Sequence, residues 1–181
     1  MKSILIFAFL IMATQNSNTT TKVLYDFKQF DGPAGWRIIN DGVMGGLSKG
    51  NIGMDDEGNG LFWGSVSLAN NGGFSMASLS LNTTSVTGYS KVVVELKGDK
   101  KKYQLRLKSR RSQMHSYVKT FETSGEWEFI EVPFDEMEPR FRGRLLDMPA
   151  FQADQIEEIA LLIGNKAEED FKLAIRSISL K

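Results

Sequence analysis

Apolar and polar residues alternate along most of the chain beyond residue 60, with the period of two that is typical of a half-buried β-strand. The alternation is clearest over 61–69, 92–96, 103–107 and 171–175. Residues 159–163 are instead continuously apolar, as expected of a buried central strand. Because no segment of useful length has helical periodicity, the pattern predicts an all-β fold of several short strands.

Turn signals separate the predicted strands. The segment 70–73, Asn-Asn-Gly-Gly, predicts a tight connection into Phe74, because Asn and Gly accept the positive φ that such turns need. The charged segment 98–102 predicts a turn that makes the strands on either side of it antiparallel neighbours. A change of apolar phase near Phe129 predicts a bulge or a twist. Many short strands separated by turns favour a β-sandwich or a barrel.

The composition is that of one globular domain. The chain has 181 residues, of which 41% are hydrophobic, enough to bury a sizeable core. Lys plus Arg and Asp plus Glu number 22 each, so no net charge attracts the protein to nucleic acid or to an anionic membrane. The absence of cysteine excludes disulfides and thiolate chemistry. We therefore expect that the protein has no nucleic-acid partner and that it recognises any other partner by local shape.

No set of residues points to catalysis or to a bound cofactor. His115 is the single histidine, which excludes a multi-histidine metal site, and nothing near it in the sequence completes a catalytic triad. The glycine-rich segment 42–46 lacks the spacing of phosphate-binding loops. A calcium ion on loop carboxylates is an alternative, but the chain has no EF-hand spacing. The sequence predicts a non-enzymatic protein without a cofactor or a metal site.

Two glycine-rich segments beside strand-like sequence are the most distinctive local feature. Glycine relieves the steric ban on positive φ and lets other groups approach the main chain closely. The expected structural glycines are Gly42, Gly45, Gly46, Gly72 and Gly73. The candidates for one recognition surface formed by both segments are Asn40, Asp41, Val43, Met44, Asn70, Asn71 and Phe74. The alternative is a tight loop in which Asn40 and Asp41 hydrogen-bond the backbone.

Two further features have both a structural and a functional interpretation. Arg106 and Lys108 belong to a basic cluster, but alternation places them opposite the apolar residues of their strand, so a solvated face is favoured over a surface for an acidic partner. The three tryptophans are most simply core residues. Trp63 is in the phase opposite Phe62 and Val66, which makes it a candidate for stacking on a sugar ring.

The N-terminus has the pattern of a signal peptide. Lys2 precedes an apolar run at 4–13, which is too short to span a membrane as a helix. We expect residues 1–13 to be a signal peptide, 14–22 a polar linker and 23–181 the folded domain, with no transmembrane span in the mature chain. This pattern predicts export to the periplasm or the outside of the cell. A cytoplasmic or membrane-associated protein is the alternative.

Several segments together resemble the Complex I intermediate-associated protein 30 family. They are Trp36, NDGVMGGLS at 40–48, FWGSVSLANNGGF at 62–74, YQLRL at 103–107, PRFRGR at 139–144 and FKLAI at 171–175. The likeness covers residues 23–181 in the family's order. It is densest in the two glycine-rich segments, and those two runs together are its most specific part.

The resemblance implies a galactose-binding-like jelly roll, a topology that periodicity alone does not select. It also implies a single-domain member of bacterial type, similar to the assembly factors of NADH:ubiquinone oxidoreductase, which bind respiratory-complex intermediates. Such a protein acts through protein–protein contacts. The alternative is an exported protein similar to a carbohydrate-binding module, with a glycan as its partner, because galactose-binding-like domains often hold sugars at loop-rich ends of the sandwich.

Overall fold

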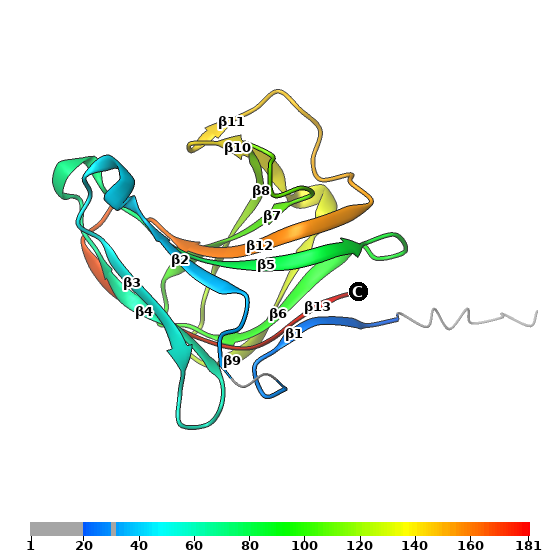
Figure 1. Ribbon diagram of the computed structural model, residues 1–181, viewed down its shortest axis with the longest axis horizontal. Coiled ribbons are helices and arrows are strands. Elements are labelled where there is room, and N and C mark those ends of the chain that lie inside the picture. The colour runs from blue at the N-terminus through cyan, green and yellow to red at the C-terminus, as the bar shows by residue number, and fades with distance from the viewer. Residues whose placement is uncertain (1–19, 30–31) are drawn as a thin grey trace, which may run out of the picture.

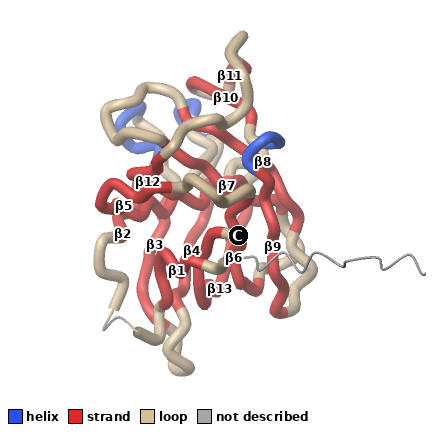
Figure 2. The backbone as a smooth tube through the Cα atoms, turned by 90° about the vertical axis from the view of Figure 1, so that its right-hand side faces the viewer, coloured by secondary structure: helices blue, strands red, loops and turns tan. Residues whose placement is uncertain are grey.

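The computed structural model describes residues 20–29 and 32–181, which form a sandwich of two packed β-sheets (Figure 1). Three short 3-10 helices lie in connections between strands (Figure 2). Within these described residues, no helix is long and apolar enough to cross a membrane. The all-β sandwich expected from the sequence is confirmed. The predicted signal peptide and most of the predicted linker fall outside the described residues.

One layer is a six-stranded antiparallel sheet in the order β3-β4-β13-β6-β9, with β1 also paired to β13. Its strands are β1 (Lys22–Asp26), β3 (Lys49–Met54), β4 (Gly60–Val66), β6 (Lys91–Lys97), β9 (Trp127–Pro133) and β13 (Glu169–Leu180). β13 contains the strand predicted at 171–175 and pairs with β1, β4 and β6. It is therefore the central strand of this layer.

The other layer is a seven-stranded sheet in the order β11-β10-β8-β7-β12-β5-β2. Its strands are β2 (Trp36–Asn40), β5 (Ser75–Ser85), β7 (Lys102–Lys108), β8 (Ser116–Glu122), β10 (Glu138–Phe141), β11 (Arg144–Leu145) and β12 (Gln155–Ile163). The apolar run at 159–163 lies in β12, between β7 and β5, and is almost fully buried. The prediction of a central strand there is confirmed.

The core fills the space between the two sheets. Phe62 of β4 and Phe171 of β13 lie with their ring centroids 4.7 Å apart, and they face fully buried residues of the other sheet such as Leu105 and Ile159. Each buried side chain of this size contributes roughly 1.5–3 kcal/mol. The inner faces of the sheets are thus buried in the core, and only the outer faces and the loops are accessible to a partner.

The predicted turn at 98–102 is wrong in one respect. The strands on either side of it, β6 and β7, are in different sheets. The Asp99 carboxylate accepts hydrogen bonds from Tyr103 Oη at 2.9 Å in one sheet and from the Lys172 N–H at 3.0 Å in the other. The segment is therefore an arch between the layers, and strand periodicity is the same for an arch and for a hairpin.

The bulge predicted near Phe129 is also absent. β9 pairs with β6 in one uninterrupted register from Trp127 to Pro133. The phase changes because β9 carries aromatic residues on its outer face, where Phe129 is 64% exposed and the Trp127 ring lies under the Arg176 guanidinium at 4.1 Å. An exposed aromatic residue, and not a shift of register, explains the pattern.

A candidate binding groove on the seven-stranded sheet

The two glycine-rich segments lie side by side at one end of the sandwich (Figure 1). The first contains η1 (Asp41–Met44) between β2 and β3, and the second contains η2 (Ala69–Asn71) between β4 and β5. Both segments therefore cross from one sheet to the other. Asn70 Nδ2 donates a hydrogen bond to Gly45 O at 3.0 Å, which links the two segments directly.

Asp41 is the main connection between these segments. It is only 1% exposed, and its Oδ2 accepts hydrogen bonds from Ser48 Oγ at 2.5 Å, from the Gly73 N–H at 2.6 Å and from the Phe74 N–H at 3.3 Å. Its Oδ1 accepts one from the Ser48 N–H at 3.1 Å. Burial acts to raise the pKa of Asp41, but these hydrogen bonds outweigh it, so the pKa lies below its usual range.

Asn40 has a similar internal role. Its Oδ1 accepts hydrogen bonds from the Gly50 N–H at 3.2 Å and from Ser75 Oγ at 2.8 Å, one on each sheet. Asn40 and Asp41 therefore form the hydrogen bonds of the tight-loop alternative. Asp41 also lines the groove described below.

The expected structural glycines divide into three groups. Gly45 and Gly73 have φ values of 86° and 137°, which disfavour any residue with a Cβ. Gly46 and Gly72 lie so close to Asp41 that a Cβ would approach its carboxylate to 2.3 and 2.6 Å. Gly42 has open space around it, and nothing in the structure requires glycine there.

The other candidates of the loop surface are placed differently. Asn71 and Phe74 line a groove on the outer face of the seven-stranded sheet, together with Gly72 and Gly73. Asn70 is exposed at the link to the first segment. The backbone of Val43 and Met44 lies in η1.

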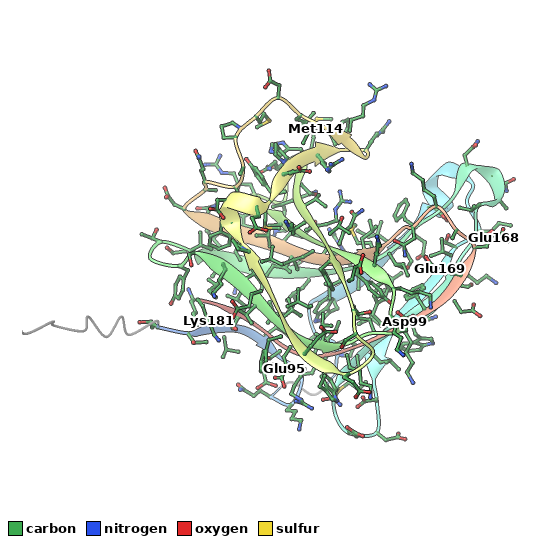
Figure 3. All side chains as sticks on the ribbon, turned by 180° about the vertical axis from the view of Figure 1, so that it is seen from behind. Glu95, Asp99, Met114, Glu168, Glu169 and Lys181 are labelled. Carbon is green, nitrogen blue, oxygen red and sulfur yellow. The ribbon has the colours of Figure 1, made fainter. Side chains whose placement is uncertain are left out.

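The groove has a volume of about 620 Å³, within the range of ligand sites in proteins. Its floor is formed by the outward-facing residues of β2, β5, β12 and β7, and Arg140 to Gly143 of β10 and the turn after it line the far side. In Figure 1, the β10–β11 hairpin rises at the edge of the sheet opposite to β2. Met114 belongs to the same rim and lies at this end of the molecule in Figure 3, far from Glu95 of the six-stranded sheet.

Cross-strand register orders the floor into rows. One row is largely apolar and consists of Ile39, Met76, Leu162 and Gln104. The next row consists of Arg37, Ser78, Ala160 and Arg106, so two small residues lie between two arginines. In the third row, Glu158 is adjacent to Lys108. The groove thus combines apolar contact area with hydrogen-bonding and cationic groups on rigid strands.

Glu158 is the acidic group at the centre of the floor. It is 4% exposed and bonds to Arg37 Nη2 at 2.8 Å, with Lys108 Nζ at 3.8 Å. Arg106 is half-buried and contacts the amide oxygen of Gln104 at 3.2 Å. Burial lowers the pKa of Arg106, and Glu158 only partly offsets this. Arginine still stays charged at any ordinary pH.

The sequence interpretation of this basic strand was incomplete. Arg106 and Lys108 do face away from the apolar residues of β7, as alternation predicts, but their face is the floor of the groove and not a freely solvated surface. The groove residues of β2, β5 and β12 were missed altogether. Their only signal is that they occupy the outward phase of their strands, and that phase does not reveal which outer face is hollow.

Trp63 lies elsewhere. It is 38% exposed on β4 of the six-stranded sheet, beside Gly53 of β3, and it does not line the groove. Among residues 20–29 and 32–181, no group of three or more histidine or acidic side chains could hold a metal ion. His115 bonds to Gln113 at 2.6 Å and contacts the ring of Tyr117. The groove is therefore the main candidate site in the part of the chain that the structure describes.

Comparison with known proteins supports the fold and identifies the family. The chain resembles a family 11 carbohydrate-binding module from Clostridium thermocellum, with a TM-score of 0.66, 19% identity and coverage of 88% of this chain and 94% of the module. A CBM4 structure has a TM-score of 0.51 at 12% identity and covers 84% of this chain and 91% of its own. At these identities the likeness shows the fold alone, and it confirms the predicted jelly roll.

Two comparisons of sequence complete the picture. An uncharacterized protein of Schizosaccharomyces pombe is 23% identical over 177 residues, which cover 82% of this chain and 81% of the relative. The model of the Complex I intermediate-associated protein 30 family matches residues 25–175, which include both glycine-rich segments and every strand of the groove floor. The chain belongs to the Complex I intermediate-associated protein 30 family.

Proposed function

We propose that this protein is a non-catalytic binding protein that holds a glycan chain in the groove of the seven-stranded sheet. The observation that carries the proposal is the groove itself, about 620 Å³ of open space over a floor of strand residues. Side chains on strands are held more rigidly than side chains on loops, which reduces the entropy lost when a ligand binds. Sugars need both an apolar surface and ordered hydrogen-bonding groups, and the rows of the floor supply both.

The structural comparison is consistent with a glycan. One of the similar modules was determined in complex with a β-1,3-1,4-mixed-linked tetrasaccharide, and an agarase domain also has this fold, with a TM-score of 0.55. These ligands and activities belong to those proteins. For this chain they indicate only that a jelly roll of this shape suits an extended polar ligand.

The carboxylates of the groove support binding without catalysis. Asp41 accepts four hydrogen bonds from the two glycine-rich segments, and Glu158 is engaged by Arg37 and Lys108. Hydrolysis of a glycosidic bond requires two carboxyl groups that face the same sugar, one of them protonated. Neither carboxylate is free for that role.

Affinity electrophoresis against a panel of neutral and acidic polysaccharides tests the proposal. We expect retardation by at least one of them, and a loss of at least tenfold in affinity in Phe74→Ala, which removes an aromatic ring from the groove. Phe129→Ala is the matched control, because it removes an exposed ring from the other sheet. Unchanged binding in Phe74→Ala, or no binding to any polysaccharide by wild type, would contradict the proposal.

A protein partner is the second candidate function, and it follows from the family's name. The observation in its favour is that Leu47 and Leu68, beside the glycine-rich segments, are 57% and 41% exposed. Leu47→Asp should then abolish capture of a respiratory-complex intermediate from solubilised membranes. Val23→Asp is the control and should not change capture, because Val23 is 54% exposed on β1 of the six-stranded sheet. Equal capture by both variants would rule out contact through this surface.

We also propose that the protein is exported, because the pattern of Lys2 and the apolar run at 4–13 is that of a signal peptide. An exported protein meets glycans directly, so this location fits the groove. Cell fractionation of the native host tests it.

A further inference from the structure

The groove is cationic, although the chain as a whole carries no net charge. Its acidic lining residues are Asp41 and Glu158, and both are already engaged. Its cationic lining residues are Arg37, Lys108, Arg106, Arg140, Arg142 and Lys166. A surplus of positive charge in a concave site attracts anionic ligands and repels cationic ones. The charge of the groove therefore indicates the sign of the charge on its ligand.

Arg106 is the most informative of these cations. It lies half-buried in the floor, and in the described part of the chain no carboxylate comes within 4.0 Å of it in an ion pair. Its one hydrogen-bonding partner is the neutral amide of Gln104 at 3.2 Å. Glu158 attracts the Arg106 guanidinium only from beyond ion-pair distance and is already paired with Arg37, so it offsets the burial of Arg106 only in part. A planar anion that meets the guanidinium in two parallel hydrogen bonds would supply a closer counter-charge.

The spacing of the cations fits a chain of charges better than one small anion. Arg37 on β2 and Arg106 on β7 are separated by β5 and β12, so their backbones lie roughly 14 Å apart at ordinary strand spacing. Arg140 on β10 continues the series two strands further on, and it is paired with Glu138 at 2.7 Å, as Arg37 is paired with Glu158. Ser78 and Ala160, both buried, lie between the two arginines of the row. The cations are thus distributed along the groove, across the strands.

We infer that the ligand of the groove is an anionic glycan, whose carboxylate or sulfate groups recur along the chain and pair with Arg37, Arg106 and Arg140. The inference rests on the proposed function and narrows it to one class of glycan. Arg106 is the specificity-determining residue, because it is the cation of the floor with no carboxylate of its own. Glu158 acts in the opposite sense, because its negative charge repels an anionic ligand and neutralises part of the charge of Arg37.

Matched polysaccharide pairs test this inference. Galacturonan and its methyl ester differ by the charge on each sugar, and a sulfated galactan and its desulfated form test the other source of anions. We expect wild type to bind the charged member of at least one pair tenfold or more tightly than the neutral member. The preference should weaken as the salt concentration rises.

Three variants assign the preference to the groove. Arg106→Gln should reduce affinity for the charged glycan about tenfold and leave affinity for the neutral one unchanged, while Glu158→Gln should raise affinity for the charged glycan several-fold. Lys97→Gln removes a charge from the six-stranded sheet and is the control, expected to change neither. Folding of each variant is checked by its melting temperature.

The outcomes separate this inference from the proposed function. Equal affinity for both members of each pair, or an equal loss of both in Arg106→Gln, would overturn the anionic ligand and leave a groove for neutral glycans. Weaker binding of the charged glycan in Glu158→Gln would likewise contradict it. A failure to bind any of these polysaccharides would remove the proposed function together with the inference.

Discussion

Replacement of Asp41 by alanine should destabilise the protein strongly, because one buried carboxylate connects both glycine-rich segments. The substitution removes the acceptor for three backbone N–H groups, those of Ser48, Gly73 and Phe74, and for the Ser48 hydroxyl. An orphaned buried donor costs about 1–3 kcal/mol. Since loop N–H groups can regain some water after the change, we expect a total loss of about 3 kcal/mol, at the upper end of typical point mutations.

Urea denaturation followed by tryptophan fluorescence measures this loss. A change of about 3 kcal/mol corresponds to a fall of roughly 6–12 °C in melting temperature for a domain of this size. Asp56→Ala is the matched control, because Asp56 is an exposed loop carboxylate without a hydrogen bond in the described part of the chain. A free energy of unfolding for Asp41→Ala within about 0.5 kcal/mol of wild type, a change typical of neutral surface positions, would refute the assignment of Asp41 as the connection between the segments.

The same residue predicts a dependence on pH. The pKa of Asp41 is lower in the folded protein than in the unfolded chain, where it is about 3.9. Its contribution is therefore fully present above the unfolded value and is lost as the pH falls through the folded value. The difference in stability between wild type and Asp41→Ala should be constant at neutral pH and should shrink below about pH 4. A difference that stays constant down to pH 2 would show that the ionised carboxylate is not what stabilises the loops.

Three further predictions concern the backbone, the arch and the N-terminus. Gly46→Ala should destabilise the protein by about 1–3 kcal/mol, since its Cβ would lie 2.3 Å from the Asp41 carboxylate. Gly42→Ala is the control and should be nearly neutral, because Gly42 has open space around it. Equal melting temperatures of the two variants would show that the close approach at Gly46 is unimportant. Burial and the neighbouring Asp99 raise the pKa of Tyr103 in the folded protein. The contribution of Tyr103 to stability should therefore be present below the unfolded tyrosine pKa of about 10 and be lost as the pH rises above it. Spectrophotometric titration should show Tyr103 ionising only as the protein unfolds, and ionisation in the folded state would contradict this. Mass spectrometry of the protein from its native host should find a mature N-terminus at or near residue 14, and an intact Met1 would exclude the cleaved signal peptide.

Much of the fold could be predicted from the sequence, because alternation reports directly which residues of a strand face the core. The buried strand at 159–163 and the alternating strand at 171–175 are cases in point. Pairing between strands was harder to predict. The arch at 98–102 has the same charged, turn-forming residues as a hairpin, and only the contacts of Asp99 with both sheets distinguish it.

The site was predictable only in part, for a related reason. Glycine and Asn at 70–73 indicated the unusual backbone of one loop, and Asn71 and Phe74 do reach the groove. The floor residues come from four strands that are distant in sequence, and an outward-facing arginine such as Arg106 has the same pattern on a flat solvated face as in a groove. The walls at 71–74 and 140–143 distinguish the two cases, and they come from parts of the chain far from β7 in sequence.

Methyl NMR of methionine tests the central claim, that the outer face of the seven-stranded sheet is the binding surface. Met76 and Met114 line the groove, whereas Met54 and Met148 are exposed outside it, at 38% and 44%, and serve as internal controls. The probes are trigalacturonate and the β-1,3-1,4-mixed-linked tetrasaccharide, titrated into the wild-type protein. The account predicts shifts of the Met76 and Met114 methyl signals with at least one probe, and unchanged signals from Met54 and Met148. Shifts confined to Met54 or Met148, or no shift of any methionine with either probe, would contradict it.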